Sequence, residues 1–211
     1  MTDHYAVIGN PIAHSKSPLI HTEFAKQTGQ AMAYEGILAP LDDFAGTVLA
    51  LIKQGYKGVN VTVPFKFAAY DMADQRSERA MAAGAANTLS FTVNGILADN
   101  TDGAGLVRDI QVNKQCEFAG KRVLLIGAGG AAEGVLQPIL AAKPSLLVIT
   151  NRSLDKAQAM LSKVAATSTK LQAVPLDGLG DGAFDIVINA TSAGLSGSQL
   201  AIPDSIFAPD C

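Results

Sequence analysis

The chain has 211 residues, with 16 lysines and arginines against 19 aspartates and glutamates, and a formal net charge of -3. Hydrophobic residues make up 48% and charged residues only 17%, which supports a buried core of one or two domains and excludes a disordered polyanion. A slightly acidic chain without basic clusters also disfavours nucleic acid as a partner, because phosphate backbones are bound by lysine and arginine.

The N-terminus and the cysteines favour a cytoplasmic protein. No basic segment followed by an apolar stretch opens the chain, and no apolar run reaches the ~18 residues of a membrane helix. We therefore expect neither a signal peptide nor a membrane anchor. Cys116 and Cys211 cannot form a CxxC pair or a zinc cluster, so we expect reduced thiols and no metal site.

The first predicted elements are a buried strand and a helix. The strand covers residues 5–8 and ends at Gly9. Ser17 followed by Pro18 is typical of an N-cap with proline at the first helical position. Gly29 is a natural end for that helix.

A second helix and an alternating strand follow. Apolar residues recur at helical spacing from Phe44 to Ile52, and Gly55 ends the helix. From Gly58 to Val63, apolar and polar residues alternate, which predicts a half-buried strand closed by Pro64.

A hairpin is predicted between residues 88–93 and 96–98. Asn94-Gly95 between them is typical of a type I′ turn. The first half of the chain is therefore predicted to be α/β, with an antiparallel pair at one side.

A second α/β unit is predicted from Lys121. Residues 122–126 predict a buried strand, residues 127–130 a glycine-rich turn, and the next residues a helix. This alternation of apolar strands with helices predicts a parallel, doubly wound sheet. Further strands are predicted at residues 146–150, 171–174 and 185–189, with Ser153 capping the helix between the first two.

The glycine-rich turn matches a dinucleotide-binding motif. Gly127, Gly129 and Ala132 fit G-x-G-x-x-[GA], which allows a tight turn, close approach of a pyrophosphate and close helix–strand packing. A helix N-terminus then favours the anion. Glycine-rich turns also serve as bare packing devices, but here the motif follows a strand and opens a helix, which favours a dinucleotide. The candidate phosphate-binding residues are Gly127, Ala128, Gly129, Gly130 and Ala131.

The end of the next strand indicates which dinucleotide is bound. NAD sites place an acidic residue there, whereas this chain has Asn151, Arg152 and Ser153. Arg152 could pair with a ribose 2′-phosphate, with Lys156 one turn later as a second cation. The alternative is that both are solvated surface charges. NADP is therefore the expected cofactor.

Glu133 is a discordant residue near this turn. It lies in the first turn of the phosphate-binding helix, where its charge suits the helix dipole but would repel a pyrophosphate. We expect its side chain to point to solvent.

Several further motifs occur in order along the chain, and together they resemble the shikimate dehydrogenases of chorismate and aromatic amino acid biosynthesis. The resemblance runs from end to end, and ordered motifs are more specific than any one of them. It rests on Gly9-Asn10-Pro11-Ile12-Ala13-His14-Ser15-Lys16-Ser17-Pro18, Asn60-Val61-Thr62-Val63-Pro64-Phe65-Lys66, Gly84-Ala85-Ala86-Asn87-Thr88, Asp99-Asn100-Thr101-Asp102-Gly103, the glycine loop, Asn151-Arg152-Ser153 and Ile188-Asn189-Ala190-Thr191-Ser192-Ala193-Gly194.

Two serines are candidates for binding a substrate carboxylate. Ser15 and Ser17 lie just beyond a strand end, where open α/β sheets usually bind ligands, and two hydroxyls at i and i+2 can converge on one carboxylate. Ser17 could instead only cap the next helix. The resemblance favours substrate binding by both serines.

The resemblance also implies a proton-handling pair. Lys66 alone would be read as a solvated charge and Asp102 as an N-cap, but the family pairs the two at the substrate. The carboxylate would orient the ammonium and tune its pKa, and either group could carry the proton. By the same resemblance, Thr62 and Asn87 hydrogen-bond substrate oxygens, and Thr191 and Ser192 belong to the cofactor site.

The resemblance implies an open α/β substrate domain at residues 1–101 and a Rossmann-type NADP-binding domain at residues 102–211, with the chemistry in the cleft between them. The family continues beyond position 211, where it normally supplies a tyrosine, a glutamine and a helix returning to the first domain. The expected assembly is a monomer or a homodimer.

The expected reaction is the reversible NADPH-dependent reduction of 3-dehydroshikimate to shikimate, a small-molecule substrate. Two alternatives stay open: a quinate/shikimate dehydrogenase that uses NAD, and a non-catalytic NADP-binding regulator. The absence of a Tyr-x-x-x-Lys motif and of a cysteine–histidine cluster disfavours short-chain and zinc alcohol dehydrogenases.

Overall fold

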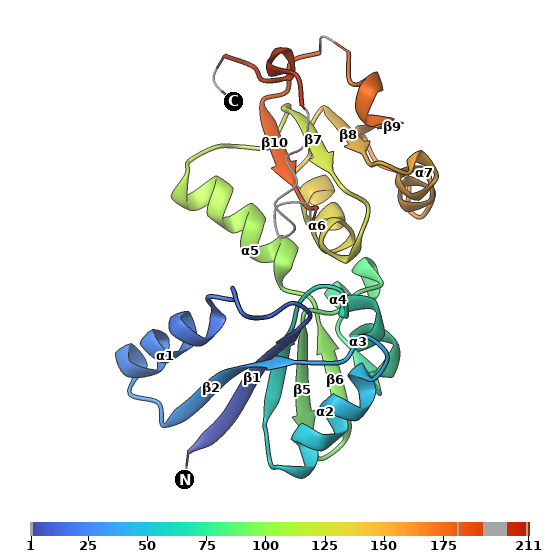
Figure 1. Cartoon of the computed structure of the whole chain (residues 1–211). Coiled ribbons are helices and arrows are strands. Elements are labelled where there is room, and N and C mark those ends of the chain that lie inside the picture. Colours follow the sequence, from blue (N-terminus) through green and yellow to red (C-terminus); the bar gives the residue numbers. More distant parts are fainter. Residues whose placement is uncertain (1, 181, 192–201, 210) are drawn as a thin grey trace. The chain divides into compact units, whose positions relative to one another are not determined.

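The computed structural model describes residues 2–180, 182–191, 202–209 and 211. The chain divides into two units, Met1–Thr101 and Asp102–Cys211 (Figure 1). Each unit builds its own sheet.

The first unit is built on a mixed sheet of six strands in the order β2-β1-β3-β5-β6-β4. β1 pairs in parallel with both β2 and β3, whereas β5 runs antiparallel to β3 and to β6. The strands are β1 (Asp3–Gly9), β2 (Met32–Leu38), β3 (Gly58–Val61), β4 (Gln75–Arg76), β5 (Thr88–Thr92) and β6 (Gly95–Asp99), and the helices are α1 (Ser17–Thr28), α2 (Phe44–Lys53), α3 (Lys66–Met72) and α4 (Glu78–Ala83).

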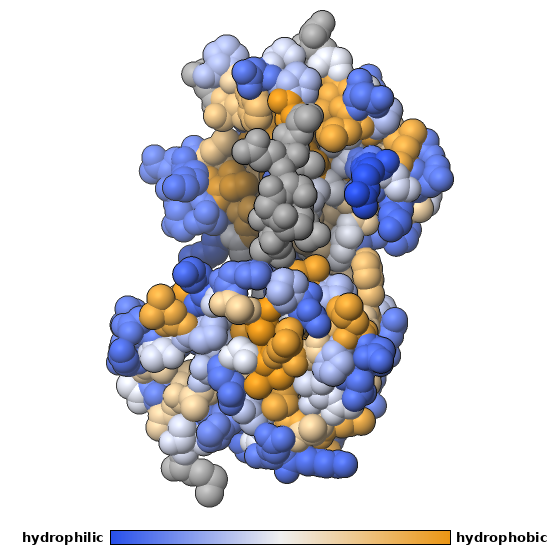
Figure 2. Space-filling view, viewed as in Figure 1, coloured by the Kyte–Doolittle hydropathy of each residue, from blue (hydrophilic) through white to orange (hydrophobic). Residues whose placement is uncertain are grey.

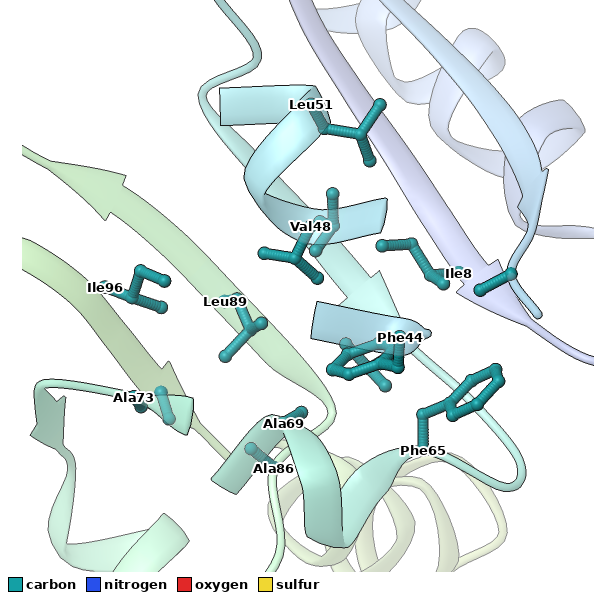
Figure 3. Close-up of a cluster of buried hydrophobic side chains, with 14 of the residues drawn as sticks. Ile8, Phe44, Val48, Leu51, Phe65, Ala69, Ala73, Ala86, Leu89 and Ile96 are labelled. Atoms are coloured by element: carbon teal, nitrogen blue, oxygen red, sulfur yellow. The ribbon is translucent and has the colours of Figure 1, made fainter. Parts of the chain in front are cut away.

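The core of this unit lies on one face of the sheet. Alternate strand residues such as Ile8 and Leu89 point at apolar residues of α2 and α3, and Phe44 stacks on Phe65 with ring centroids 4.9 Å apart (Figure 3). α1 lies beside β2 and buries only Ala25 (Figure 1). The opposite face of the sheet carries polar and aromatic side chains together with the buried Val7.

The start of α1 differs from the prediction by one residue. Lys16 is the N-cap, so Ser17 is the first helical residue and Pro18 the second. The predicted N-cap role of Ser17 is therefore wrong, and its hydroxyl is available for other contacts. The predicted end is confirmed, because Gly29 takes the left-handed conformation with φ 65°.

The hairpin forms, but its turn differs from the prediction. Thr92 pairs with Gly95, so the connecting residues are Val93 and Asn94. Among the residues described, only Gln115 and Lys143 combine a side chain with positive φ, so Asn94 does not, which rules out the type I′ turn predicted at Asn94-Gly95. The residue with positive φ is instead Gly95, at 104°, which follows the two connecting residues.

Elements of low apolar periodicity were not predicted. These are the half-exposed strand β2, the short β4, and the short helices α3 and α4. β3 is also shorter than predicted, because the regular strand ends at Val61 and the chain turns before Pro64.

The second unit is a parallel sheet of four strands in the order β10-β7-β8-β9. The first strand lies inside the sheet and the order reverses beside it, as in a Rossmann-type fold. The strands are β7 (Arg122–Ile126), β8 (Leu146–Thr150), β9 (Lys170–Val174) and β10 (Ile186–Asn189), and the helices are α5 (Asp102–Arg108), a π-helical turn (Asp109–Asn113), α6 (Gly130–Ala141), α7 (Leu154–Ser162) and the 3-10 turns Leu176–Gly178 and Asp204–Ile206.

The central strands of this sheet, β7 and β8, are buried on both faces. Val123, Leu125 and Ile149 pack against α6 and α7, while Leu124 and Ile126 pack against the irregular segments around Leu179 and Ile206. The mixed α/β fold class predicted from the sequence is confirmed, and so is Ser153 as the N-cap residue of α7.

The exposed surface mixes polar and apolar side chains. Across residues 2–180, 182–191 and 202–209, none of the helices combines the length and apolar character needed to cross a membrane. Hydrophilic and hydrophobic areas alternate over the visible face (Figure 2). The larger exposed apolar side chains include Leu19 and Phe24 of α1.

Candidate active site

The predicted substrate residues of the first unit lie on or directly after loops that meet one edge of its sheet. β1, β3 and β6 all end at this edge, and β5, which runs the opposite way, begins there. Ligands of open α/β sheets bind at such a carboxyl edge. Ser15, Thr62 and Asn87 lie in these loops, and Ser17 and Lys66 are the first residues of α1 and α3, which follow them.

Ser15 and Ser17 stand next to one another at the start of α1. The Ser15 hydroxyl oxygen accepts a hydrogen bond from the Ser17 N–H at 3.3 Å, and the Ser15 N–H bonds the Ile12 carbonyl. Both side chains are half-buried. The Ser15 hydroxyl is therefore held by the backbone at the start of α1.

Lys66 is held by the core residue that precedes it. Phe65 is only 4% exposed and stacks on Phe44, so the first residue of α3 is fixed at the sheet edge. The Lys66 carbonyl accepts the Ala86 N–H at 2.8 Å, which ties α3 to the loop before β5. Lys66 thus opens a helix, whereas the sequence predicted only that it follows a strand.

Thr62 follows β3 directly. Its N–H donates to the Ile8 carbonyl at 2.9 Å and its carbonyl accepts the Phe65 N–H at 3.0 Å. These bonds hold the loop between β3 and α3 against the end of β1.

The orientation of the Asn87 amide is set by its neighbours. Its Oδ1 accepts the Thr88 hydroxyl at 2.9 Å and the Thr101 N–H at 3.0 Å, and its Nδ2 donates to the Thr101 hydroxyl at 2.9 Å. Because the carbonyl oxygen already accepts these bonds, Asn87 would offer its Nδ2 donor to a substrate oxygen.

The segment that leads to Asp102 is fixed by Asp99. The Asp99 carboxylate accepts hydrogen bonds from Arg79, from the Ser77 hydroxyl and from the Asn100 N–H. Asn100 is 2% exposed and donates its Nδ2 to the Ala85 carbonyl at 3.0 Å. The Arg79 bond, more than the others, lowers the pKa of the Asp99 carboxyl.

Replacing Asp99 should weaken the fold in a pH-dependent way. The lowered pKa of Asp99 means that its contribution is present above its ordinary pKa of 3.8 and is lost as the pH falls below it. Asp99→Asn should therefore cost about 1 kcal/mol in the free energy of unfolding near neutral pH, because Arg79 is partly exposed. The difference from wild type should shrink below about pH 4.

Urea unfolding at several pH values measures this difference. Arg79→Met is the matched variant, since it removes the main cause of the lowered pKa and should lose the same pH-dependent part. A difference between Asp99→Asn and wild type that stays constant as the pH falls would show that the carboxylate charge is not involved.

The glycine turn of the second unit lies at the point where the strand order reverses. Gly127 follows β7 with φ 116°, and a Cβ added there would lie 3.0 Å from the Ala190 carbonyl oxygen, beyond β10. Only glycine fits a backbone with this φ and this close approach. This geometry fits the tight turn of a dinucleotide site.

The N-terminus of α6 has the donors that a pyrophosphate needs. Gly129 is the N-cap in an extended conformation, and no side chain caps the first turn. The N–H groups of Gly130, Ala131 and Ala132 open the helix, while the Glu133 N–H already bonds the Gly129 carbonyl. Anions bind at such helix ends.

The end of β8 carries cations where an NAD site carries a carboxylate. Asn151 donates its Nδ2 to the Ser153 carbonyl at 2.9 Å, which shapes the loop, and Arg152 and Lys156 are both exposed. This arrangement fits a 2′-phosphate.

Beyond β10, the loop is held by Asn189. The Asn189 Oδ1 accepts both the Thr191 N–H at 3.0 Å and the Thr191 hydroxyl at 2.8 Å. Thr191 lies close to Gly127, whose added Cβ would meet the Thr191 methyl group at 3.2 Å. Ser192, the other predicted cofactor residue of this loop, lies outside the described residues.

Glu133 contradicts the prediction that it points to solvent. Its residue is 8% exposed, and its carboxylate accepts a hydrogen bond from Lys163 Nζ at 2.8 Å. The helix around it is buried on several sides, so a side chain in its first turn has little access to water. Lys163, which sequence reasoning missed, balances the negative charge beside the glycine turn.

Breaking this ion pair should destabilise the second unit. Lys163→Met should lower the free energy of unfolding by about 1 kcal/mol, because Glu133 would stay buried without its partner while Lys163 itself is 65% exposed. Adding Glu133→Gln should recover most of the loss. Chemical unfolding measures both, with Lys170→Met as an exposed-lysine control; equal losses for Lys163→Met and Lys170→Met would contradict the pairing.

Neither a metal nor a disulfide is indicated. Within the described part of the chain, no group of three or more histidine, cysteine, aspartate or glutamate side chains could hold a metal ion. Cys116 and Cys211 are both free.

Family profiles match both units. The profile of the shikimate dehydrogenase substrate binding domain matches residues 7–89. The profile of shikimate / quinate 5-dehydrogenase matches residues 110–196.

Individual relatives agree with these profiles. The chain is 57% identical to shikimate dehydrogenase (NADP(+)) of Methylobacillus flagellatus, over 99% of this chain and 77% of the relative. It is 54% identical to the enzyme of the same name from Nitrosospira multiformis, over 99% of this chain and 75% of the relative.

Solved structures are similar as well. An Ael1 enzyme from Pseudomonas putida superposes with a TM-score of 0.86 at 47% identity, covering 97% of this chain and 75% of that one. A shikimate dehydrogenase from Thermus thermophilus in complex with shikimate superposes with a TM-score of 0.82 at 30% identity, covering 98% and 74%.

Proposed function

The chain belongs to the shikimate dehydrogenase family, and from this premise we propose that it reduces 3-dehydroshikimate reversibly to shikimate with NADPH. It is an NADP-dependent oxidoreductase that acts on a secondary alcohol in aromatic biosynthesis. The observation that carries the proposal is the gathering of Ser15, Ser17, Thr62, Lys66 and Asn87 at one edge of the first sheet.

Substrate binding falls to the first unit, residues 1–101. Ser15 and Ser17 would donate their hydroxyls to the substrate carboxylate, since the backbone turn already places them side by side. Thr62 and Asn87 would bond the ring hydroxyls, with Asn87 donating through Nδ2.

The proton is handled by Lys66 and Asp102. In the direction of reduction, the Lys66 ammonium gives a proton to the carbonyl oxygen of the substrate, and the carbonyl carbon receives a hydride. In the direction of oxidation, neutral Lys66 takes that proton back. Asp102 would orient the ammonium toward the substrate. NADPH, when bound, supplies the hydride.

Cofactor binding falls to the second unit, residues 102–211. The backbone of the turn from Gly127 through Ala128 to Ala131 would hold the pyrophosphate, which fits the tight turn at Gly127 and the uncapped helix start. Arg152 and Lys156, with Asn151 and Ser153, would hold the 2′-phosphate. Thr191 and Ser192 would complete the site.

The location and the assembly of the chain are inferred from its family and its cysteines. We propose a cytoplasmic protein that acts as a monomer or homodimer on a small-molecule substrate. Two cysteines without a disulfide support a reducing compartment.

An initial-rate assay tests the proposed function. The purified chain is mixed with shikimate or quinate and with NADP+ or NAD+, and the absorbance of the reduced nicotinamide is followed. The expected result is fastest product formation with shikimate and NADP+. Preference for quinate and NAD+ would indicate the alternative dehydrogenase, and NADP+ binding without turnover would indicate a regulator.

A further inference from the structure

The hydroxyl of Tyr34 reaches across the central strand of the first sheet. Tyr34 lies in β2 opposite Tyr5 of β1, and Asn60 lies in β3 opposite Val7 of β1. The Tyr34 hydroxyl donates to Asn60 Oδ1 at 2.6 Å. Since β1 separates β2 from β3, this bond passes over β1 on the face opposite the apolar core.

From Asn60 the hydrogen bonds continue to a substrate residue. Asn60 Nδ2 donates to the Thr88 hydroxyl at 3.2 Å, and the Thr88 hydroxyl donates to Asn87 Oδ1 at 2.9 Å. Each polar group in this series has one defined direction of donation. Three side-chain bonds therefore connect Tyr34 to Asn87, and they fix which end of the Asn87 amide faces outward.

At its other side, Tyr34 contacts the start of α1. The Ser17 side chain lies close enough to the Tyr34 hydroxyl to lower its pKa slightly. His21, one turn further along α1, stacks on the Tyr34 ring with centroids 4.2 Å apart and planes at 10°. Burial raises the pKa of Tyr34, so its hydroxyl stays protonated and keeps donating at neutral pH.

We propose that Tyr34 is a positioning residue for substrate binding: its ring packs against α1 beside Ser17, and its hydroxyl holds Asn60 in β3 and, through Thr88, Asn87. The proposal rests on the proposed function, which places Ser17 at the substrate carboxylate and Asn87 at a ring hydroxyl. Without these contacts, both groups would still be present but less well aligned with the substrate.

Tyr34→Phe tests the role of the hydroxyl while keeping the ring that stacks on His21. We expect the KM for shikimate to rise about five- to tenfold, because Asn60 loses its hydrogen-bond donor and the series of bonds that orients Asn87 is broken at its first member. The kcat, the KM for NADP+ and the midpoint of thermal unfolding should each stay close to wild type. Tyr5→Phe is the matched control, since Tyr5 lines the same small pocket of about 100 Å³ and should behave like wild type.

Two further measurements make the outcome decisive. In a double-mutant cycle, Ser17→Ala and Tyr34→Phe should raise the KM less together than the product of their separate effects. Shikimate affinity by calorimetry should weaken in Tyr34→Phe by the same factor as the KM, and this readout does not need turnover.

The results separate the two proposals. An unchanged KM and affinity in Tyr34→Phe, or an equal rise in Tyr5→Phe, would overturn the positioning role. A fall in kcat and unfolding midpoint without a selective change for shikimate would also overturn it, because it would show a merely structural role. If wild type binds shikimate but does not oxidise it, the proposed function fails while the affinity comparison still decides the role of Tyr34. If wild type neither binds nor oxidises shikimate, both fail.

Discussion

Lys66→Ala should lower the kcat for shikimate oxidation about a thousandfold while leaving NADPH binding unchanged. A positioned acid–base group contributes roughly 10² to 10⁴ in rate, and Lys66 is the group proposed to exchange the proton with the substrate oxygen. Alanine cannot take that proton. The cofactor residues belong to the second unit, so the binding of NADPH should not depend on Lys66.

Steady-state absorbance measures the kcat, and the fluorescence of the reduced nicotinamide measures NADPH affinity. Lys53→Ala is the matched control, because Lys53 is an exposed lysine in the last turn of α2. It should retain wild-type turnover. Undiminished turnover in Lys66→Ala would remove Lys66 from the mechanism.

Arg152→Ala should change the preference between the two cofactors. The KM for NADP+ should rise about 10- to 100-fold, since charge-assisted hydrogen bonds to a phosphate contribute about 1.5–3 kcal/mol and each 1.4 kcal/mol is tenfold. The KM for NAD+ should hardly change, because NAD+ lacks the 2′-phosphate. Lys156→Ala should show a smaller effect of the same kind.

Initial rates with NADP+ and NAD+ in parallel make each variant its own control. A general loss of folding would raise both KM values, whereas loss of the phosphate contact raises only one. Equal rises for NADP+ and NAD+ would show that Arg152 does not recognise the 2′-phosphate.

Elements with strong apolar patterns could be predicted from the sequence. The buried strands β7 and β8 are continuous apolar runs, and α2 repeats its apolar residues at helical spacing. β2 was not predicted because it is an edge strand with no buried residue, and such a strand does not need the alternation of apolar and polar residues that marks a half-buried strand. The turn at Val93-Asn94 was not predicted because Asn94-Gly95 is compatible with more than one register of the hairpin, and only the pairing of Thr92 with Gly95 shows which register forms.

The candidate site was predictable where it depends on strand ends. Segments that follow β1, β3 and β8 carry Ser15, Lys66 and Arg152, and topology brings the first two to one sheet edge. Contacts between distant side chains were not predictable. Asn60 had a partial signal, because alternation in β3 placed it on the polar face, but nothing in the sequence pairs it with Tyr34.

The burial of Glu133 shows the same limit. A carboxylate in a first helical turn is usually solvated, and the pattern of α6 does not reveal that the helix is enclosed on several sides. Its partner Lys163 lies 30 residues away at the end of α7, beyond the reach of local patterns.

A crystal structure of the chain with shikimate and NADP+ bound would show directly which side chains hold the substrate. We expect the shikimate carboxylate within hydrogen-bonding distance, about 2.5–3.0 Å, of the Ser15 and Ser17 hydroxyls, with Lys66 Nζ hydrogen-bonded to the hydroxyl that is oxidised. Shikimate bound away from the edge where β1, β3 and β6 end, with these three side chains untouched, would contradict this expectation.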